Sequence, residues 1–280
     1  MTTLRRFRYA LSKSRLRVPF VLLRHRGLDV RDVFFGSYPR SGSTWLRFLL
    51  FETLSGQSSE FGKVNTSIPN VGDHRKAPRL LPGGGRLIKT HEPYRNSYEK
   101  ALYLVRDPRD VVLSEFAYHQ ALGVVGGEFD KYLLSFLRKT VSPFGSWQYN
   151  VQTWLQAKMP QGRNIVVIKF EDLRGNTAAT LAHILEFLNV SRDSEAIQRA
   201  VDNNSVEKMR EKENRSPQRV SQKGRFIRTG TAGGWRQRLT DRQIELIESY
   251  THELLASLGY PADGAFDSKL KQQLTPVTKP

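Results

Sequence analysis

The chain has 280 residues, a formal net charge of +17 and no cysteine. This length allows one large α/β domain or two smaller ones, and the absence of cysteine excludes a disulfide scaffold, cysteine-based zinc sites and thiol catalysis. The positive charge points to anionic partners, namely nucleic acid, an acidic membrane face, or small molecules that carry phosphate or sulfate.

The first segment, residues 1–31, carries nine Lys/Arg and one acid. Its apolar stretch, 18–23, has six residues and contains a proline. That is too short for the core of a signal peptide or for a transmembrane helix. We therefore expect a basic, amphipathic lead-in helix and, by default, a cytoplasmic protein. Weak contact of this helix with an acidic membrane is the alternative.

Four short apolar runs alternate with helical patterns along the middle of the chain. The runs are almost continuously apolar, as is typical of parallel strands buried on both faces, and they cover residues 32–37, 86–90, 101–105 and 164–169. The helical patterns cover residues 44–54, 108–119, 147–159 and 177–188. This alternation predicts an α/β fold with a central, mainly parallel sheet flanked by helices.

The last predicted helix covers residues 241–258, where Thr240 and Gln243 fit a capping box at its start. Residues 263–280 are predicted to be a flexible tail. No internal repeat and no composition break divides the remainder. We therefore expect a single domain over residues 32–262, preceded by the lead-in segment.

Two long stretches between these elements are predicted as loops. Residues 57–85 and 209–228 are rich in Gly, Ser, Pro or charge, and both exceed the usual loop length, as lids and binding segments often do. Residues 208–228 also form the second basic segment, with eight Lys/Arg and two acids.

The first motif, residues 37–45, joins the first strand to the helix that follows it. Backbone N–H groups at a helix start, together with the helix dipole, attract anions. Arg40 adds positive charge, and hydroxyl donors come from Ser41, Ser43 and Thr44. The motif is not a Walker A loop, because five residues separate Gly36 from Gly42 where that motif has four, and Ser43 stands where it has lysine. An ordinary capped turn is the alternative.

The second motif, residues 89–93, ends the second predicted strand. Ligands of open α/β sheets bind outside the carboxyl ends of strands, and a neutral imidazole such as that of His91 can remove a proton from a hydroxyl near pH 7. Lys89 lies two residues earlier and therefore shares a face with His91, where it could neutralise an anion. A turn histidine without a catalytic role is the alternative.

The third motif, residues 103–114, contains Arg106 at the end of the third predicted strand. Arginine suits phosphate because its planar fork bonds two oxygens, and Ser114, about two helical turns into the next helix, could add a hydroxyl. An ion pair of Arg106 with Asp107 or Asp110 is the alternative. Glu115 is a second candidate base, without a supporting pattern.

The fourth motif, residues 228–236, is a glycine-rich loop bounded by arginines. Such a loop can wrap a phosphate with backbone N–H groups. Loops of this composition are common, so the motif is weak by itself and gains weight only beside the other three.

Taken together and in order, the four motifs resemble the sulfotransferase family that uses 3'-phosphoadenosine-5'-phosphosulfate (PAPS), especially its cytosolic type. Tyr38–Trp45 is similar to the family's phosphosulfate loop Tyr-Pro-Lys-Ser-Gly-Thr-Thr-Trp, with arginine in place of lysine. Lys89–Pro93 matches its Lys-Thr-His-x-Pro, and residues 228–235 match its Arg-x-Gly-x-x-Gly-x-Trp. Two departures concern the adenine site: Phe170 stands where a tyrosine is frequent, and Val206 replaces a stacking phenylalanine.

The resemblance implies a P-loop-like three-layer fold and transfer of a sulfuryl group from PAPS to a hydroxyl or amine, without a metal. His91 would be the general base, and Lys89 and Arg40 would stabilise charge on the transferred group and the leaving oxygen. Trp45 would stack on adenine. The residues implied to bind the nucleotide are Arg40, Ser41, Gly42, Ser43, Thr44, Trp45, Arg106, Ser114, Phe170, Arg228, Thr229 and Gly230.

Two other functions stay open. One is a P-loop kinase or NTPase, which the missing Gly-Lys-Ser/Thr disfavours. The other is a nucleic-acid or acidic-surface binder with a vestigial nucleotide site. No series of stacking aromatics accompanies the basic segments, so a nucleic-acid partner is not expected.

The acceptor and the oligomeric state are not specified by the sequence. The predicted acceptor loops, 57–85, 120–146 and 209–228, contain aromatic and charged residues, so small phenolic, glycan and lipid acceptors all stay open. The basic residues outside the motifs are not needed for a nucleotide. They favour an anionic acceptor or a membrane surface.

Overall fold

The computed structural model describes residues 17–138, 141–158, 164–216, 227 and 230–262. Its described strands form one sheet in the order β2-β1-β3-β4, and every pair is parallel. The strands are β1 (Val33–Ser37), β2 (Leu87–Thr90), β3 (Lys100–Val105) and β4 (Asn164–Lys169). The predicted central parallel sheet is therefore confirmed.

The register aligns the carboxyl ends of the first three strands. Gly36, next to the end of β1, pairs with Thr90 at the end of β2 and with Tyr103 near the end of β3. The motifs that follow these strands therefore emerge at one edge of the sheet, where open α/β folds bind ligands.

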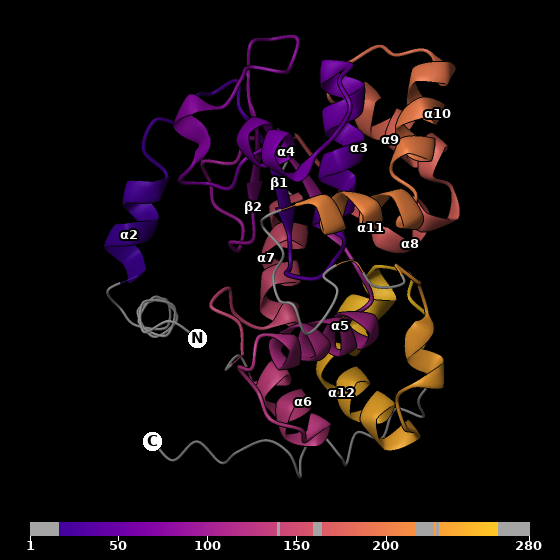
Figure 1. The fold of residues 1–280 in the computed structure, drawn as a ribbon. Coiled ribbons are helices and arrows are strands. Elements are labelled where there is room, and N and C mark those ends of the chain that lie inside the picture. Colours follow the sequence, from indigo (N-terminus) through magenta and orange to yellow (C-terminus); the bar gives the residue numbers. More distant parts are fainter. Residues whose placement is uncertain (1–16, 139–140, 159–163, 217–226, 228–229, 263–280) are drawn as a thin grey trace.

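The strands send alternate side chains into two cores, one on each face. Phe35 and Leu102 belong to one core, and Phe34 and Tyr103 belong to the other. This explains why the strands are almost continuously apolar, because both faces are buried. The first core is completed by helices α3, α4, α9, α10 and α11, and the second by α5, α6, α7 and α12 (Figure 1).

Five helices lie where the sequence predicts them. They are α3 (Ser43–Ser55), α5 (Pro108–Ala121), α7 (Trp147–Lys158), α9 (Thr177–Phe187) and α12 (Asp241–Ser257). The capping box of α12 is present, because the Thr240 side chain accepts from the Gln243 amide and the Gln243 side chain accepts from the Thr240 amide. Helix α2 (Arg17–Arg24) lies in the predicted lead-in segment.

The two predicted long loops contain helices. Residues 57–85 include α4 (Phe61–Ser67), whose Val64 is buried in the first core, and a short helical turn, η1 (His74–Lys76). Residues 209–215 belong to α11 (Val206–Arg215). The loop predictions were wrong here because the segments bury a few anchors rather than a full apolar stripe, which weakens the helical pattern.

Three further helices have no counterpart in the predicted elements: α6 (Phe129–Leu137), α8 (Phe170–Gly175) and α10 (Ser194–Asn203). Two side chains support the start of α10 and α11, since Asp193 and Ser205 accept hydrogen bonds from backbone N–H groups of the first turn. Within the described ranges, no helix combines the length and apolarity needed to cross a bilayer.

Candidate active site

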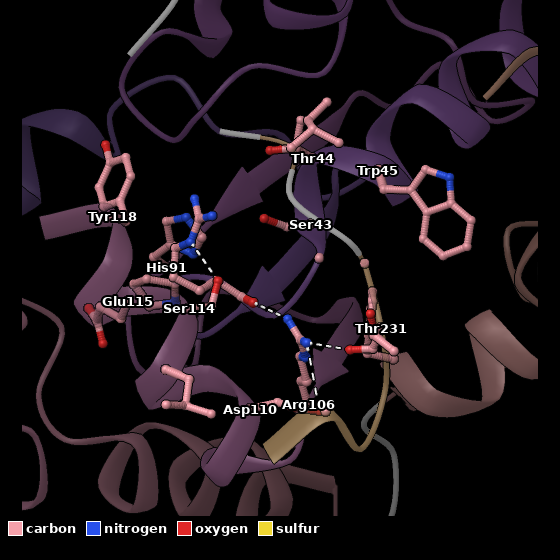
Figure 2. A pocket seen from close by; sticks show the side chains of 18 of the residues that line it. Ser43, Thr44, Trp45, His91, Arg106, Asp110, Ser114, Glu115, Tyr118 and Thr231 are labelled. Carbon is pink, nitrogen blue, oxygen red and sulfur yellow. Dashed lines mark hydrogen bonds and ion pairs between the residues drawn. The ribbon is translucent and has the colours of Figure 1, made fainter. Parts of the chain in front are cut away.

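A cavity of about 820 Å³ opens at the carboxyl edge of the sheet (Figure 2). Residues of all four sequence motifs line it. Of the predicted site residues, those on its wall are Arg40, Gly42, Ser43, Thr44, Trp45, Lys89, His91, Arg106, Ser114, Phe170 and Gly230. Arg228 and Thr229 lie outside the described residues, so their predicted roles stay predictions.

The loop between β1 and α3 is tightly folded. Arg40 and Gly42 both have positive φ, 67° and 94°. A Cβ on Gly42 would lie 2.4 Å from the Phe170 ring, so this position must be glycine for two independent reasons. Gly42 is also the N-cap of α3, and no side chain caps the first turn among the described residues. The first-turn amides are therefore available to an anion in the cavity.

Ser41 does not join this wall. Its side chain is fully buried, its Oγ has no hydrogen-bond partner among the described residues, and it is not part of the cavity lining. The hydroxyls that do line the cavity beside the helix start belong to Ser43 and Thr44. As a donor to bound phosphate, Ser41 would therefore have to act through its backbone.

Arg40 points across the cavity toward α5. Its Nε donates to Ser114 Oγ at 3.2 Å, and its guanidinium carbon lies 4.8 Å from the centre of the Tyr118 ring. The serine oxygen that accepts this bond still has its own O–H to donate to another oxygen. The structure thus joins two residues that the sequence motifs place 74 positions apart.

Lys89 and His91 contact each other directly. Lys89 Nζ lies 2.7 Å from His91 Nε2 and 3.2 Å from Asn70 Oδ1. On the other side of the ring, His91 Nδ1 lies 2.6 Å from the Ser37 carbonyl oxygen. A carbonyl can only accept, so Nδ1 carries the proton and Nε2 presents its lone pair to Lys89.

Burial lowers the pKa of both groups. The pKa of His91 lies well below its ordinary value because of burial and the neighbouring Lys89 ammonium. The pKa of Lys89 is likewise lowered by burial and by the nearby Arg47 guanidinium. The imidazole is therefore held neutral at physiological pH, in the tautomer whose basic nitrogen, Nε2, contacts Lys89 Nζ.

Arg106 lies on the other side of the loop between β1 and α3. Its guanidinium donates to the backbone carbonyls of Arg40 and Thr231 at 3.2 and 2.9 Å, and one amino group lies 3.7 Å from Asp110 (Figure 2). The ion pair considered as an alternative thus exists. Arg106 nevertheless lines the cavity, and its Nε has no partner among the described residues.

Asp110 has a different main role that sequence reasoning missed. It accepts from the backbone N–H groups of Gly233 and Trp235 at 2.8 and 3.1 Å. Asp110 therefore fixes the glycine-rich loop to the start of α5. Gly230 of the same loop has φ of 60° and lies in the cavity wall. The i, i+4 spacing from Arg106 was visible in the sequence, but the loop it holds was not.

One end of the cavity is apolar and aromatic. Phe170 packs edge-on to Trp45, with ring centres 6.2 Å apart, and lies under the Arg106 guanidinium at 4.5 Å. Trp45 donates its indole N–H to the Asn204 carbonyl and carries Arg174 over its ring at 5.2 Å. Three further apolar side chains complete this end: Val206, which the resemblance places at the adenine site, and Met209 and Ile227, from the loop that was predicted to serve the acceptor.

The opposite end gathers residues from α5 and from the segment before α7. Its aromatic walls are Tyr118 and Phe144, and the Phe144 ring centre lies 5.5 Å from that of His91. Glu115 lies in this wall and is buried, and its Oε2 has no hydrogen-bond partner among the described residues. Burial raises the pKa of Glu115 to about 8, against the opposing effect of Arg40.

The described residues contain no group of three or more His, Asp or Glu side chains arranged to hold a metal ion. The cations of the cavity wall are instead side chains, namely Arg40, Lys89, Arg106, Arg174 and Arg238. The wall is thus suited to a ligand with more than one anionic group.

Comparison with known proteins gives one consistent result. A family model described as a sulfotransferase domain matches residues 30–259. Human sulfotransferase 2A1 is 25% identical over 251 residues, which cover 81% of this chain and 85% of the relative. The 3-alpha-hydroxysteroid sulfotransferase of Cavia porcellus is 28% identical over 254 residues, with coverage of 82% and 85%.

Solved structures agree on the fold. The chain resembles a retinol dehydratase crystallised with androsterone and the inactive cofactor PAP, with a TM-score of 0.68, 21% identity and 83% of each chain covered. It also resembles mouse SULT7A1 in complex with PAP, with a TM-score of 0.65, 20% identity and 90% of each chain covered.

Proposed function

Because the chain belongs to the sulfotransferase domain family, we propose that it transfers a sulfuryl group from PAPS to a hydroxyl or amine acceptor, with His91 as the general base. The observation that carries the proposal is that four motifs, distant in the sequence, line one cavity beside an uncapped helix start. A kinase or NTPase function is not retained, because the first loop departs from the Walker A pattern and the family model matches most of the chain.

The cavity wall fits the nucleotide. The start of α3, with Ser43 and Thr44, offers backbone and hydroxyl donors to a 5'-phosphosulfate. Arg106 and the Ser114 hydroxyl offer a second anion site for a 3'-phosphate. The apolar end at Trp45 suits a purine ring. Solved structures of related fold contain PAP, the desulfated nucleotide, which is consistent with this assignment.

His91 performs the proton transfer in this proposal. Its Nε2 lone pair must leave Lys89 Nζ and accept the proton of the acceptor hydroxyl as that oxygen attacks sulfur. One S–O bond forms to the acceptor, and the bond between sulfur and the 5'-phosphate oxygen breaks. The products are the sulfated acceptor and adenosine 3',5'-bisphosphate, and the proton stays on His91 until it passes to solvent.

Lys89 and Arg40 supply the electrostatic part. Once displaced from His91, Lys89 Nζ is a donor within the cavity, and Arg40 reaches the same space from the phosphate loop. Donors fixed beforehand at the position where charge develops are worth about 2.7–4 kcal/mol each in transition-state stabilisation. No metal is required for this chemistry, because the cations of the wall face the developing charge.

The acceptor end favours small molecules with an apolar body. Tyr118, Val141, Pro143 and Phe144 form apolar walls close to His91, and Glu115 places one carboxyl group among them. One relative of the chain is named as a 3-alpha-hydroxysteroid sulfotransferase, and a fold neighbour was crystallised with androsterone. We therefore propose a lipophilic alcohol or phenol as acceptor.

A thermal-shift panel tests the nucleotide part. Adenosine 3',5'-bisphosphate should raise the melting temperature, with the logarithm of its concentration above Kd, whereas ATP and GTP should have little effect. Transfer of labelled sulfate from PAPS to a set of alcohols and phenols then tests the reaction. Magnesium-dependent ATP hydrolysis without any response to adenosine 3',5'-bisphosphate would overturn the proposal.

The Arg106→Ala variant tests the orientation of the nucleotide. It should weaken the binding of adenosine 3',5'-bisphosphate by roughly tenfold to a hundredfold, as loss of a charge-assisted contact does. Adenosine 5'-phosphosulfate lacks the 3'-phosphate and should lose little. Equal losses for both ligands in calorimetry would contradict the 3'-phosphate site.

A further inference from the structure

Exposed apolar side chains gather at one place on the described surface. Four large apolar residues are exposed in the described ranges, and three of them lie within nine residues: Leu22 at 61%, Leu23 at 52% and Val30 at 81%. The fourth, Tyr149, lies apart on α7. A cluster of this kind on an otherwise polar surface marks an interaction site more often than isolated exposed residues do.

Helix α2 presents this cluster as an ordered face. Pro19, Leu22 and Leu23 are all exposed and follow the i, i+3, i+4 spacing that places residues on one side of a helix, and the exposed Arg26 lies two residues after the helix ends. Val21, on the opposite side, is buried. The helix therefore exposes apolar side chains on its outer side, while Val21 packs its inner side onto the protein.

Three contacts hold α2 against the body of the protein. Val21 is buried, the Arg24 guanidinium donates to the Val71 carbonyl at 3.0 Å, and His25 Nε2 lies 2.7 Å from the Tyr98 hydroxyl. The helix thus lies on the β2 side of the sheet, against the segment that carries Val71 (Figure 1). Leu22 and Leu23 stay exposed.

Basic residues surround the apolar face. Arg26, Arg31, Arg75, Lys76 and Arg79 are exposed around it. Contacts hold this group together, since Arg75 Nε donates to the Arg26 carbonyl. The acids nearby are Asp29, which pairs with both Arg31 and Arg79, and the exposed Asp73. The surroundings are therefore net positive.

We propose that this α2 face, made of Pro19, Leu22, Leu23, Arg26 and Val30, docks the protein onto a bilayer that contains anionic lipids. Exposed leucines can enter the boundary between headgroups and acyl chains, while the surrounding arginines contact the headgroups. The sequence continues from this helix into residues 1–16, which add five Lys/Arg and no acid.

The positive charge around the α2 face favours an anionic bilayer over a second copy of the chain or residues 1–16 as the partner of this face. A second copy of the chain would bring the same basic surroundings against each other, and residues 1–16 are themselves basic, so both would be repelled from this face. An anionic membrane is complementary in both respects, because it accepts apolar side chains and attracts arginine. The acceptor class proposed above is not needed for this inference.

Co-sedimentation with lipid vesicles tests the proposal on the full chain. Vesicles of phosphatidylcholine alone are compared with vesicles that also contain phosphatidylserine. The wild type should bind the anionic vesicles far better, with affinity that falls as salt rises. The double variant L22Q/L23Q should reduce the partition coefficient roughly tenfold or more, because two leucines lose their burial in the bilayer.

Y149Q is the matched control, since it removes the exposed apolar residue that lies outside the α2 face, and it should bind as the wild type does. Thermal unfolding of all three proteins shows whether each is folded. The proposal is overturned if the wild type binds both vesicle types equally, or if folded L22Q/L23Q binds anionic vesicles as well as the wild type. It is also overturned if light scattering shows a dimer that L22Q/L23Q dissociates.

Discussion

Three ionisable side chains in the cavity wall give it its chemistry. His91 is kept neutral and its tautomer is fixed by the Ser37 carbonyl, so its basic nitrogen is available without a change of protonation. Lys89 occupies that nitrogen in the free protein. Glu115 is the opposite case, an acid that burial keeps protonated near neutral pH. Each state follows from removal of water rather than from residue type.

The His91→Ala variant should lower turnover by about 10²–10⁴-fold, the usual contribution of a general base, and should leave binding of adenosine 3',5'-bisphosphate nearly unchanged. Steady-state kinetics and calorimetry measure the two effects separately. Because the pKa of His91 is lowered, wild-type activity should also stay constant as pH falls to about 6.5. Near-normal turnover of the variant would remove His91 from the role of base.

Glu115 should make stability depend on pH. The pKa of Glu115 is raised to about 8, so the folded protein keeps a proton that the unfolded chain loses from about pH 4.5 upward. Stability should therefore fall as pH rises through this window, by up to about 1.4 kcal/mol per pH unit. Glu115→Gln should remove this part of the slope in urea denaturation between pH 5 and 8. Parallel curves for the two proteins would contradict the assignment.

At the scale of elements, the cavity depends on how α11 is fixed to α3. Lys212 on α11 donates to Glu52 Oε1 of α3 at 3.2 Å, to Ser59 Oγ at 2.7 Å and to Asn204 Oδ1 at 2.9 Å, and all four groups are buried. The same helix supplies Val206 and Met209 to the apolar end of the cavity. A polar cluster therefore positions an apolar wall.

Lys212→Met should destabilise the protein by about 3 kcal/mol, because it leaves the Glu52 carboxylate buried without its cation. It should also weaken adenosine 3',5'-bisphosphate binding, since the α11 wall loses its anchor. Lys208→Met on the exposed side of the same helix is the matched control and should change stability by less than about 0.5 kcal/mol. Equal unfolding free energies of the two variants would show that the cluster does not hold α11.

At the scale of the whole molecule, the net charge of +17 separates into two functions. Arg40, Lys89 and Arg106 line the cavity, whereas none of the basic residues that the structure describes in 17–31 and 208–216 does. The described parts of the two basic segments therefore belong to surfaces outside the proposed nucleotide site.

Reversing the charge of the basic residues between 5 and 17 should leave the affinity for adenosine 3',5'-bisphosphate unchanged, because screening is strong beyond about 10 Å at 0.1 M salt. Binding to anionic vesicles should weaken in the same variant. Calorimetry at two salt concentrations makes the comparison. A tenfold loss of nucleotide affinity at both concentrations would show that the N-terminal segment contributes to the cavity.

The sequence by itself determined the fold class and the four motifs that meet in the cavity wall. Apolar runs buried on both faces identify parallel strands, and the carboxyl ends of parallel strands share one edge of the sheet. Residues that follow each strand therefore come together at that edge, independently of the loop lengths. Arg40, Lys89, His91 and Arg106 could therefore be assigned to one site in advance. The predicted roles of the individual residues, the division at 32–262 and the cytoplasmic location stay predictions.

The tertiary structure alone decided which groups are buried and which atoms pair. Four features depend on distances between elements that are far apart in the chain. They are the contact of Lys89 with His91, the burial of the Ser41 side chain away from the cavity, the bond of Asp110 to the glycine-rich loop, and the raised pKa of Glu115. Local sequence carries no such distances, because burial is set by neighbours far apart in the chain. The helices within the predicted loops were missed for the same reason, since their stability comes from packing and not from local pattern.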